Sequence, residues 1–145
     1  MPAEELKRHE RLSFEVINRG KAAWMTWLEE NFATNLVFHA GVGSEMDMSF
    51  NDLKKFFSGF FDAFPDCHYT LDDILVEGDK SVVRYTVTGT HKGAFMGVPP
   101  TNKKVVFWEI DIYRFANGKL VEGWGRFDTF GFMQQLGVIP TPKKK

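Results

Sequence analysis

The feature that most constrains this chain is a predicted β-hairpin near its C-terminus, in which two acidic residues face two glycines. Residues 105–130 contain two strand-like segments around an Ala-Asn-Gly turn. Glu109 and Asp111 are two positions apart and therefore share one face of the first strand, because side chains alternate along a strand. Gly123 and Gly125 share one face of the second strand for the same reason. Carboxylates that face glycines, which have no side chains, indicate the wall of a pocket rather than a packed core.

The length of the turn decides which residues face one another. A two-residue loop at Asn117-Gly118, the strongest short hairpin signal, would place the acids beside Trp124 and Arg126. A three-residue loop that includes Ala116, with a bulge, would place them beside the glycines. A shift of the strand pairing by one residue would place every side chain opposite a different cross-strand partner. We favour the three-residue loop, because it also gathers one apolar face on the opposite side, formed by Trp108, Ile110, Ile112 and Trp124.

Size, charge and cysteine content narrow the class of protein. The chain has 145 residues and a formal net charge of -1, so we expect a single domain, residues 1–145, with no nucleic-acid or membrane partner. One cysteine, Cys67, excludes an intramolecular disulfide. Residues 1–10 are charged and lack the apolar run of a signal peptide, which predicts a cytoplasmic protein. An aromatic content of 15% suits an apolar cavity or a large interface, as well as a plain aromatic core.

The order of elements predicts an α+β fold, because helices come first and a run of antiparallel strands follows. Ser49 and Asp52 resemble a capping box, and phenylalanines then repeat at helical spacing up to Pro65. The predicted helices cover residues 3–18, 24–32, 49–64 and a last turn at 132–136. The predicted strands cover residues 36–39, before a Gly41-Val42-Gly43 loop, and 69–77, 81–91, 105–115 and 119–130.

The second half of the chain resembles the SnoaL-like polyketide cyclases, within the nuclear transport factor 2-like superfamily. The resemblance is carried by Gly89-Thr90-His91, Met96 to Thr101, Ile110 to Phe115, Asn117-Gly118-Lys119, Glu122-x-Trp124, Asp128 and Gln134 to Gly137. It extends more loosely into the first half through Asn18-Arg19-Gly20 and Phe64-Pro65-Asp66.

This resemblance implies a cone-shaped, cystatin-like fold, in which a curved antiparallel sheet wraps around the N-terminal helices and encloses an apolar pocket. It also implies a homodimer or higher homo-oligomer that associates through the sheet. The characterised cyclases close a ring by intramolecular aldol condensation and use neither a metal nor an organic cofactor. We therefore expect no cofactor and no metal site.

The family's catalytic pattern does not carry over unchanged. The family's acid/base is an aspartate late in the last hairpin strand, and this position falls on Gly125. The histidine two residues before it falls on Gly123, and the histidine of the preceding strand falls on Asp111. The asparagine after the second helix falls near His39. The usual catalytic aspartate is therefore absent from this chain.

Limonene epoxide hydrolases, another branch of the superfamily, supply a further comparison. They also place a catalytic aspartate at the Gly125 position, and their arginine position resembles Arg84. The partner aspartate of that arginine falls on Thr86. An epoxide hydrolase-like activity is thus an alternative for which two of the three residues are missing.

The remaining chemistry centres on the acidic face of the hairpin. Asp111 is the best candidate for a general base, because an apolar cavity raises the pKa of a carboxyl group toward the range useful for proton transfer. Glu109 could be its acid partner, since two nearby carboxylates push each other's pKa values apart. His39 could donate to a substrate carbonyl or relay a proton. His39, Asp111 and Glu109 could also form a metal set, although nothing in their spacing is specific for one.

Two classes of function follow for a pocket that binds a small hydrophobic carbonyl compound. One is cofactor-free acid/base catalysis, such as aldol-type cyclisation or isomerisation, which the two acids favour. The other is non-catalytic binding of a hydrophobic ligand, which the glycines favour because they leave room. We expect the ligand to be contacted by Arg84, Tyr113, Gly123, Gly125, Phe60 and Phe127.

Overall fold

The computed structural model describes residues 1–41 and 47–143, so Val42 and Gly43 of the predicted loop lie outside the described residues. Four helices and six strands occur in the described part of the chain. Their bounds, in chain order, are α1 Ala3–Ile17, α2 Lys21–Asn31, β1 Phe32–Gly41, β2 Asp47–Met48, α3 Phe50–Ala63, β3 His68–Glu77, β4 Lys80–Thr90, β5 Lys104–Ala116, β6 Lys119–Arg126 and α4 Thr129–Gln135. The α+β order expected from the sequence is confirmed.

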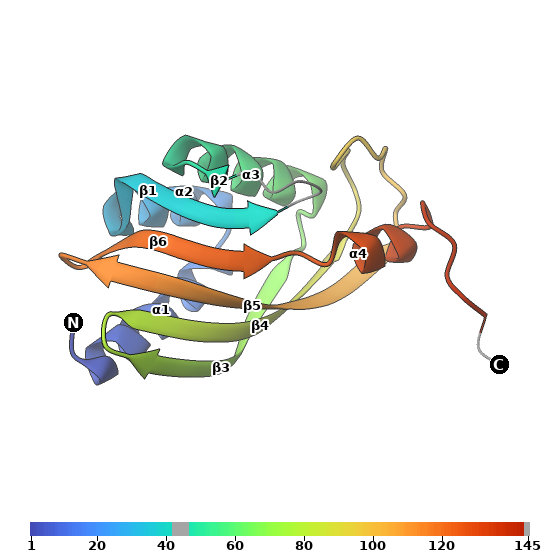
Figure 1. Ribbon diagram of the computed structural model, residues 1–145. Coiled ribbons are helices and arrows are strands. Elements are labelled where there is room, and N and C mark those ends of the chain that lie inside the picture. The colour runs from blue at the N-terminus through green and yellow to red at the C-terminus, as the bar shows by residue number, and fades with distance from the viewer. Residues whose placement is uncertain (42–46, 144–145) are drawn as a thin grey trace.

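The strands form one curved, open sheet in the order β2-β1-β6-β5-β4-β3. Helices α1 and α2 lie behind the strands in the view of Figure 1, and α3 lies at the β1 end of the sheet. The pairing is antiparallel except between β1 and β6, which run parallel. The expected antiparallel pairing is thus found throughout the described sheet except at the β1–β6 contact. The parallel contact joins segments more than 80 residues apart, and strand composition alone does not specify the relative direction of such segments.

Helix α3 forms where capping and periodicity predict it. The Ser49 hydroxyl accepts a hydrogen bond from the Asp52 backbone N–H at 3.1 Å, and the Asp52 carboxylate accepts one from the Ser49 N–H at 2.9 Å. This reciprocal pair is a capping box, so the predicted start of α3 is confirmed. The helix then turns Phe60 and Phe61 into the core, and Phe64 just beyond it is also buried. Burial of such side chains contributes roughly 1.5–3 kcal/mol each.

The β5–β6 hairpin has the predicted faces but not the predicted turn. Ala116 pairs with Lys119 around the two-residue Asn117-Gly118 loop, and both loop residues have positive φ. That geometry matches the right-handed twist of the strands. Val121 is an extra residue between two pairs of the ladder, which makes a bulge inside β6. The expected three-residue loop is therefore wrong. The bulge shifts the pairing by one residue, so that Asp111 still faces Gly125, as the expected loop would have placed it.

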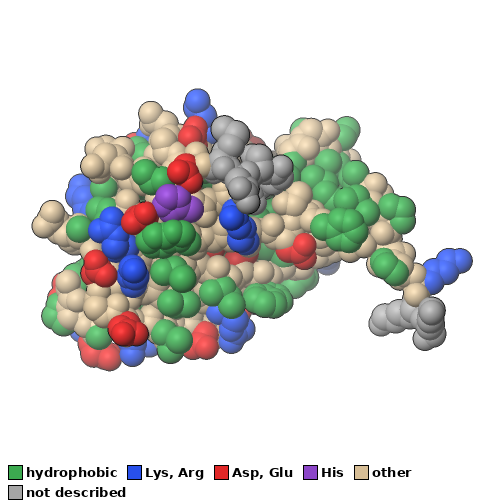
Figure 2. All heavy atoms as spheres, viewed as in Figure 1, with side chains coloured by type: hydrophobic (Ala, Val, Ile, Leu, Met, Phe, Trp, Pro, Cys, Tyr) green, Lys and Arg blue, Asp and Glu red, His purple; other side chains and the backbone are tan. Residues whose placement is uncertain are grey.

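The outer face of the sheet carries exposed apolar side chains. Trp108 is 63% exposed and Ile110 is 49% exposed, and Val106, Ile112 and Leu75 are exposed as well. Figure 2 views this face and shows hydrophobic side chains scattered between charged ones across the strands. The described helices do not cover this face (Figure 1). Among the described residues, no helix is both long and apolar enough to cross a membrane.

Candidate functional site

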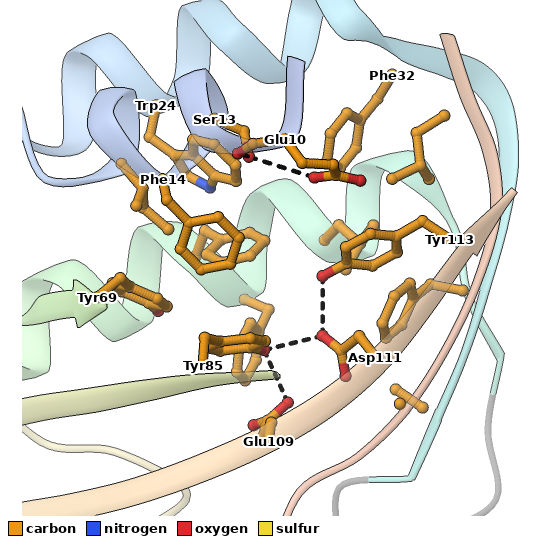
Figure 3. Close-up of a pocket in the computed structure, with 18 of the residues that line it drawn as sticks. Glu10, Ser13, Phe14, Trp24, Phe32, Tyr69, Tyr85, Glu109, Asp111 and Tyr113 are labelled. Atoms are coloured by element: carbon orange, nitrogen blue, oxygen red, sulfur yellow. Dashed lines mark hydrogen bonds between the residues drawn. The ribbon is translucent and has the colours of Figure 1, made fainter. Parts of the chain in front are cut away.

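A cavity of about 120 Å³ lies between the inner face of the sheet and helices α1, α2 and α3. Its walls are mostly aromatic, and the helix side includes Trp24, Trp27 and Phe60. Several of the rings contact one another, as Phe107 and Phe127 do with centroids 5.1 Å apart. Figure 3 shows polar side chains from α1, β4 and β5 pointing into this apolar interior. The arrangement provides a water-poor site with few, specifically placed polar groups.

The polar centre of the cavity is a cluster of two carboxyl groups and two phenols. Tyr85 of β4 lies directly across from Glu109 of β5, and Asp111 lies two positions further along β5. The Tyr85 hydroxyl is 2.9 Å from Glu109 Oε2 and 2.8 Å from Asp111 Oδ2. The Tyr113 hydroxyl donates to the same Asp111 oxygen at 2.8 Å (Figure 3). The Tyr85 phenol therefore bridges the two acids, and the Tyr113 phenol donates to Asp111 alone.

Asp111 is only 3% exposed. Burial raises the pKa of Asp111 to about 6, and the hydrogen bonds from Tyr113 and Tyr85 act against that rise by stabilising the carboxylate. Its second oxygen, Oδ1, is buried and has no hydrogen-bond partner among the described residues. This oxygen lies against Gly125, the cross-strand partner of Asp111. A desolvated, unpartnered carboxylate oxygen is a strong proton acceptor.

Glu109 is the more readily protonated member of the pair. Burial, together with the negative charge of Asp111, raises the pKa of Glu109 to about 8, while the hydrogen bond from Tyr85 opposes the shift. Asp111, which accepts hydrogen bonds from two phenols, therefore ionises more readily than Glu109. Two carboxyl groups held in opposite protonation states can act as a base and an acid in the same reaction.

A third carboxyl group enters the cavity from α1. Glu10 is 3% exposed, and its Oε1 accepts a hydrogen bond from Ser81 at 2.7 Å. Burial raises the pKa of Glu10 to about 7, and the hydrogen bonds from Ser81 and Ser13 oppose that rise. Figure 3 shows Glu10 above Tyr113, across the cavity from Asp111 and Glu109.

Glu10 and Tyr85 are site residues that the sequence pattern did not indicate. Glu10 lies on the buried face of α1, four residues after Leu6 and three before Ser13. An acidic residue at helical spacing within a buried stripe could have identified Glu10 as a candidate site residue. Tyr85 alternates with Val83 and Val87 on β4, all of them buried. We read that pattern as apolar only, although the hydroxyl of a buried Tyr usually requires a partner.

Most of the predicted site residues lie together in the cavity. Those that line it are Asp111, Glu109, Tyr113, Gly125, Phe60 and Phe127. The expected facing of Asp111 and Gly125 is confirmed by their direct pairing. The functional roles of these residues remain predictions.

His39 and Arg84 do not reach the cavity. His39 lies opposite Trp124 in the β1–β6 pair and stacks on its ring, with centroids 5.5 Å apart, on the outer face. Its two ring nitrogens are each 2.8 Å from a carboxylate, those of Asp47 and Glu122. The structure therefore does not bring His39 together with Asp111, either for proton transfer or for a shared metal.

The placement of Arg84 in the cavity was wrong. Arg84 pairs with Ile110 across the β4–β5 ladder, so it projects to the outer face with the exposed apolar residues. Its guanidinium is 3.8 Å from the Asp72 carboxylate, with the side chain 46% exposed. Because side chains alternate along β4, an inward-facing Tyr85 requires an outward-facing Arg84.

The two glycines do not leave open space, which corrects the expectation that they would. The ring of Phe38 from β1 lies where a side chain at Gly123 would project, and Gly123 does not line the cavity. Asp111 Oδ1 occupies the corresponding place at Gly125. The glycines therefore permit close packing of neighbouring side chains. Within residues 1–41 and 47–143, no group of three or more His, Cys, Asp or Glu side chains could hold a metal ion.

Comparison with known proteins places the chain in a family. The family model described as SnoaL-like polyketide cyclase matches residues 8–136, which is most of the sequence. The chain therefore belongs to the SnoaL-like polyketide cyclase family. Among curated proteins, none gives a significant match.

Solved structures show the same fold. AclR, a proposed hydroxylase from Streptomyces galilaeus, is 29% identical, with a TM-score of 0.84 over 98% of this chain and 87% of its own. IdmH, a proposed polyketide cyclase from Streptomyces antibioticus, is 26% identical, with a TM-score of 0.71 over 87% and 96% of the two chains. TsrD from Streptomyces laurentii, at 21% identity, matches with a TM-score of 0.79 over 96% and 99%. The nuclear transport factor 2-like fold expected from the sequence is confirmed.

Proposed function

We propose that this protein is a cofactor-independent enzyme that binds a small hydrophobic carbonyl compound and removes a proton from the carbon next to the carbonyl group. The observation that carries this proposal is the pair of buried carboxyl groups, Asp111 and Glu109, bridged by the Tyr85 hydroxyl inside one aromatic cavity. A purely apolar ligand needs no such pair. Burying two acids destabilises the fold, and groups buried at such a cost are concentrated at functional sites.

In the proposed reaction, Asp111 accepts the proton of the carbon acid, and the electrons of the broken C–H bond form an enolate. The enolate carbon then attacks a second carbonyl group of the same molecule, which closes a ring by a new C–C bond. The alkoxide formed there takes the proton of Glu109. In an isomerisation, the proton returns to a different carbon instead. During ring closure Asp111 gains one proton and Glu109 loses one, so the charge of the pair is conserved.

The position of Asp111 supports this assignment. The family's aspartate corresponds to Gly125 on β6, and Asp111 lies directly across from Gly125 on β5. The Asp111 carboxyl oxygen occupies the space that a side chain at Gly125 would take. The carboxylate is therefore supplied from the neighbouring strand to nearly the same place in the cavity.

A non-catalytic binding protein is the second candidate. It is favoured by the near-complete burial of Asp111, whose Oδ1 is shielded from water in this structure. A ligand would have to displace cavity side chains slightly to reach that oxygen. The two candidates differ in one respect that can be measured, which is whether a bound carbonyl compound undergoes proton transfer.

We also propose a homodimer in which the outer face of the sheet is the contact surface. The exposed apolar residues Trp108, Ile110 and Ile112 lie on one face beside Trp124, and the described helices leave them uncovered. Large apolar side chains exposed together on one face of a monomer indicate an interaction site. Association through this face leaves the cavity on the opposite side of the sheet unobstructed.

Isomerisation of 3-cyclohexenone to conjugated 2-cyclohexenone tests the catalytic proposal, because the product absorbs in the ultraviolet. We expect the wild-type protein to accelerate this reaction and Asp111→Asn to lower the rate by about 100-fold or more. Asp72→Asn, which changes a carboxylate on the outer face, is the matched control. If 3-cyclohexenone binds and protects the protein against thermal unfolding but is not converted, the binding alternative is correct.

A further inference from the structure

We infer that Glu10 is a second binding point of the cavity, which holds a hydroxyl group of the ligand on the helix side while the carbonyl group of the ligand lies at Asp111 and Glu109. The inference rests on the proposed function and narrows the class of substrate to a hydrophobic carbonyl compound with a hydroxyl group away from the carbonyl. Three observations support it: a free oxygen on Glu10, unpartnered indole N–H groups on the same side, and the position of Glu10 across the cavity.

One oxygen of the Glu10 carboxyl group is occupied by the protein and the other is not. Oε1 accepts a hydrogen bond from the Ser81 hydroxyl at 2.7 Å. Oε2 is 3.5 Å from the Ser13 hydroxyl, which donates to the Glu10 backbone carbonyl at 2.6 Å. A hydroxyl group has one proton, so Ser13 leaves Oε2 without a donor. Among the residues that the structure describes, Oε2 has no other hydrogen-bond partner and is therefore available to a ligand.

Glu10 also has no cationic partner in the cavity. Among the described residues that line the cavity, only His9 carries a basic side chain, and its Nε2 is 3.1 Å from Asn31 Oδ1. The Asn31 amide nitrogen donates to the Trp27 backbone carbonyl, so Asn31 Oδ1 is the acceptor and His9 Nε2 is the donor. The ring of His9 is thereby directed to α2. A buried acid without a cationic partner costs stability, and such groups are concentrated at functional sites.

Two indole N–H groups on the helix side of the cavity lack partners as well. Trp24 and Trp27 lie on α2 and line the cavity, and the Nε1 of each is buried without a hydrogen-bond partner among the described residues. Trp24 enters the cavity from the same side as Glu10 (Figure 3). An indole nitrogen can only donate. This side of the cavity therefore offers a free carboxyl oxygen together with free donors.

A hydroxyl group on the ligand matches both kinds of group. Its proton can go to Glu10 Oε2, and its oxygen can accept from an indole N–H. An ammonium group could donate to Glu10 but has no lone pair for the indoles, and an ether oxygen has no proton for the carboxylate. Burial raises the pKa of Glu10 to about 7. A hydroxyl group suits the protonated form too, because its oxygen can accept from the carboxylic acid.

The position of Glu10 makes this contact useful to the proposed reaction. Glu10 lies above Tyr113, across the cavity from Asp111 and Glu109 (Figure 3). A ligand that is held by its hydroxyl group at Glu10 presents its other end to the two acids. Fixing a remote group in this way orients the reacting carbon toward the base. Glu10 is thus a specificity-determining residue that contacts the ligand and not the reacting atoms.

The first experiment compares ketones that carry a hydroxyl group with analogues in which fluorine, which cannot donate, replaces it. The pairs are 3-hydroxyacetophenone with 3-fluoroacetophenone and 4-hydroxycyclohexanone with 4-fluorocyclohexanone. ¹⁹F NMR titration gives the affinity of each fluoro compound, and displacement by the hydroxyl compound gives the other affinity. In at least one pair, Glu10→Met should lower the ratio of hydroxyl to fluoro affinity by about tenfold. Glu15→Met, which changes an exposed acid on the same helix, should preserve the wild-type ratio.

Asp111→Asn tests which end of the cavity holds the hydroxyl group. It should change the affinity for both members of a pair alike and preserve their ratio, because both carry the same carbonyl group. A ratio that falls in Asp111→Asn but not in Glu10→Met would place the hydroxyl group at Asp111 and overturn the inference. Equal ratios in the wild type and Glu10→Met would overturn it as well.

The second experiment does not depend on a variant of Glu10. In ¹H–¹⁵N spectra, the indole N–H proton of Trp24 or Trp27 should move further downfield with the hydroxyl compound than with its fluoro analogue, because only the hydroxyl oxygen is a good acceptor. Trp24→Phe and Trp27→Phe assign the two signals. Trp108 and Trp124 lie on the outer face and serve as internal controls. Indole signals that do not distinguish the two compounds would contradict the inference.

Isomerisation of 3-cyclohexenone reports separately on the proposed function. A protein that isomerises this ketone but shows no preference dependent on Glu10 would overturn the present inference alone. A protein that shows the preference and the indole shifts without isomerase activity would disprove the proposed function alone, and the hydroxyl contact at Glu10 would then belong to a binding protein.

Discussion

Asp111 and Gly125 are partners across the β5–β6 pair, and Asp111 Oδ1 lies where a β-carbon at position 125 would be. The absence of a side chain at Gly125 therefore determines the position of the buried carboxylate. The φ angle of Gly125 is not in the positive range, so its requirement is for space and not for an unusual backbone conformation.

Gly125→Ala should therefore be destabilising and should displace the Asp111 carboxylate. Forcing a methyl group into this packed position costs about 1–3 kcal/mol of unfolding free energy. Chemical denaturation measures the loss, and the isomerisation rate reports on the displaced base. The matched control is Gly59→Ala in α3, where an added β-carbon meets no atom within 4 Å. At Gly59 we expect the free energy of unfolding to increase by about 0.5–1 kcal/mol, because alanine stabilises a helix interior relative to glycine. An equal effect at both positions would show that Gly125 is not sterically constrained.

The free energy of unfolding should decrease as pH rises from about 5 to 8. The folded-state pKa of Glu10 is about 7, that of Glu109 about 8 and that of Asp111 about 6, all above their ordinary values. The folded protein therefore binds more protons than the unfolded chain in this interval, and the stability that protonation provides is lost as pH passes through the folded-state pKa values. Glu10 alone can contribute as much as about 3 kcal/mol.

Glu10→Gln isolates this contribution, because the amide stays neutral and its oxygen still accepts from Ser81. Denaturation at pH 5 and pH 8 should show a smaller loss of stability in the variant than in the wild type. An unchanged difference between the two pH values would mean that Glu10 is ionised at little cost in the folded state.

The periodic elements of this fold could be predicted from the sequence because their signals are local. The apolar stripe and capping box of α3 and the alternation of β4 depend on residues within a few positions of one another. The β5–β6 hairpin shows the limit of such signals. Asn117-Gly118 specifies its own turn correctly, but the bulge at Val121 has no local motif, and it decides which residues face Asp111.

The candidate site was predictable where alternation determines the direction of a side chain, as for Asp111 and Glu109. The parts of the site that depend on contact between strands distant in the sequence were not predictable. The parallel pairing of β1 with β6 turns His39 toward Trp124 on the outer face and brings Phe38 over Gly123. Tyr85 and Glu10 were missed for another reason, since each lies on a face that is otherwise apolar, and a polar group there reveals its partners only in three dimensions.

His39 should titrate with a pKa above its ordinary value, and Glu122→Gln should lower that pKa. The hydrogen bond with Glu122 raises the pKa of His39 most, followed by that with Asp47, because both carboxylates favour the protonated ring. The stabilising effect of this charge is present at low pH and is lost as pH rises through the raised pKa. An NMR titration of the His39 ring measures the shift. Asp73→Gln removes an exposed carboxylate from β3 as a control, and an equal change in both variants would point to a general charge effect.

Ile110→Lys should convert the proposed homodimer into a monomer. Ile110 lies at the middle of the exposed apolar face, between Trp108 and Ile112, and is 49% exposed in the single chain. In a dimer formed through this face, the lysine would place two ammonium groups in an apolar contact, where each loses hydration without gaining a partner. Sedimentation equilibrium measures the change in mass. Leu12→Lys alters a similarly exposed apolar residue on α1, which lies behind the sheet, and should leave the mass unchanged. A wild-type protein that is monomeric at micromolar concentration would refute the dimer, and a dimer that persists in Ile110→Lys would place the contact on another surface.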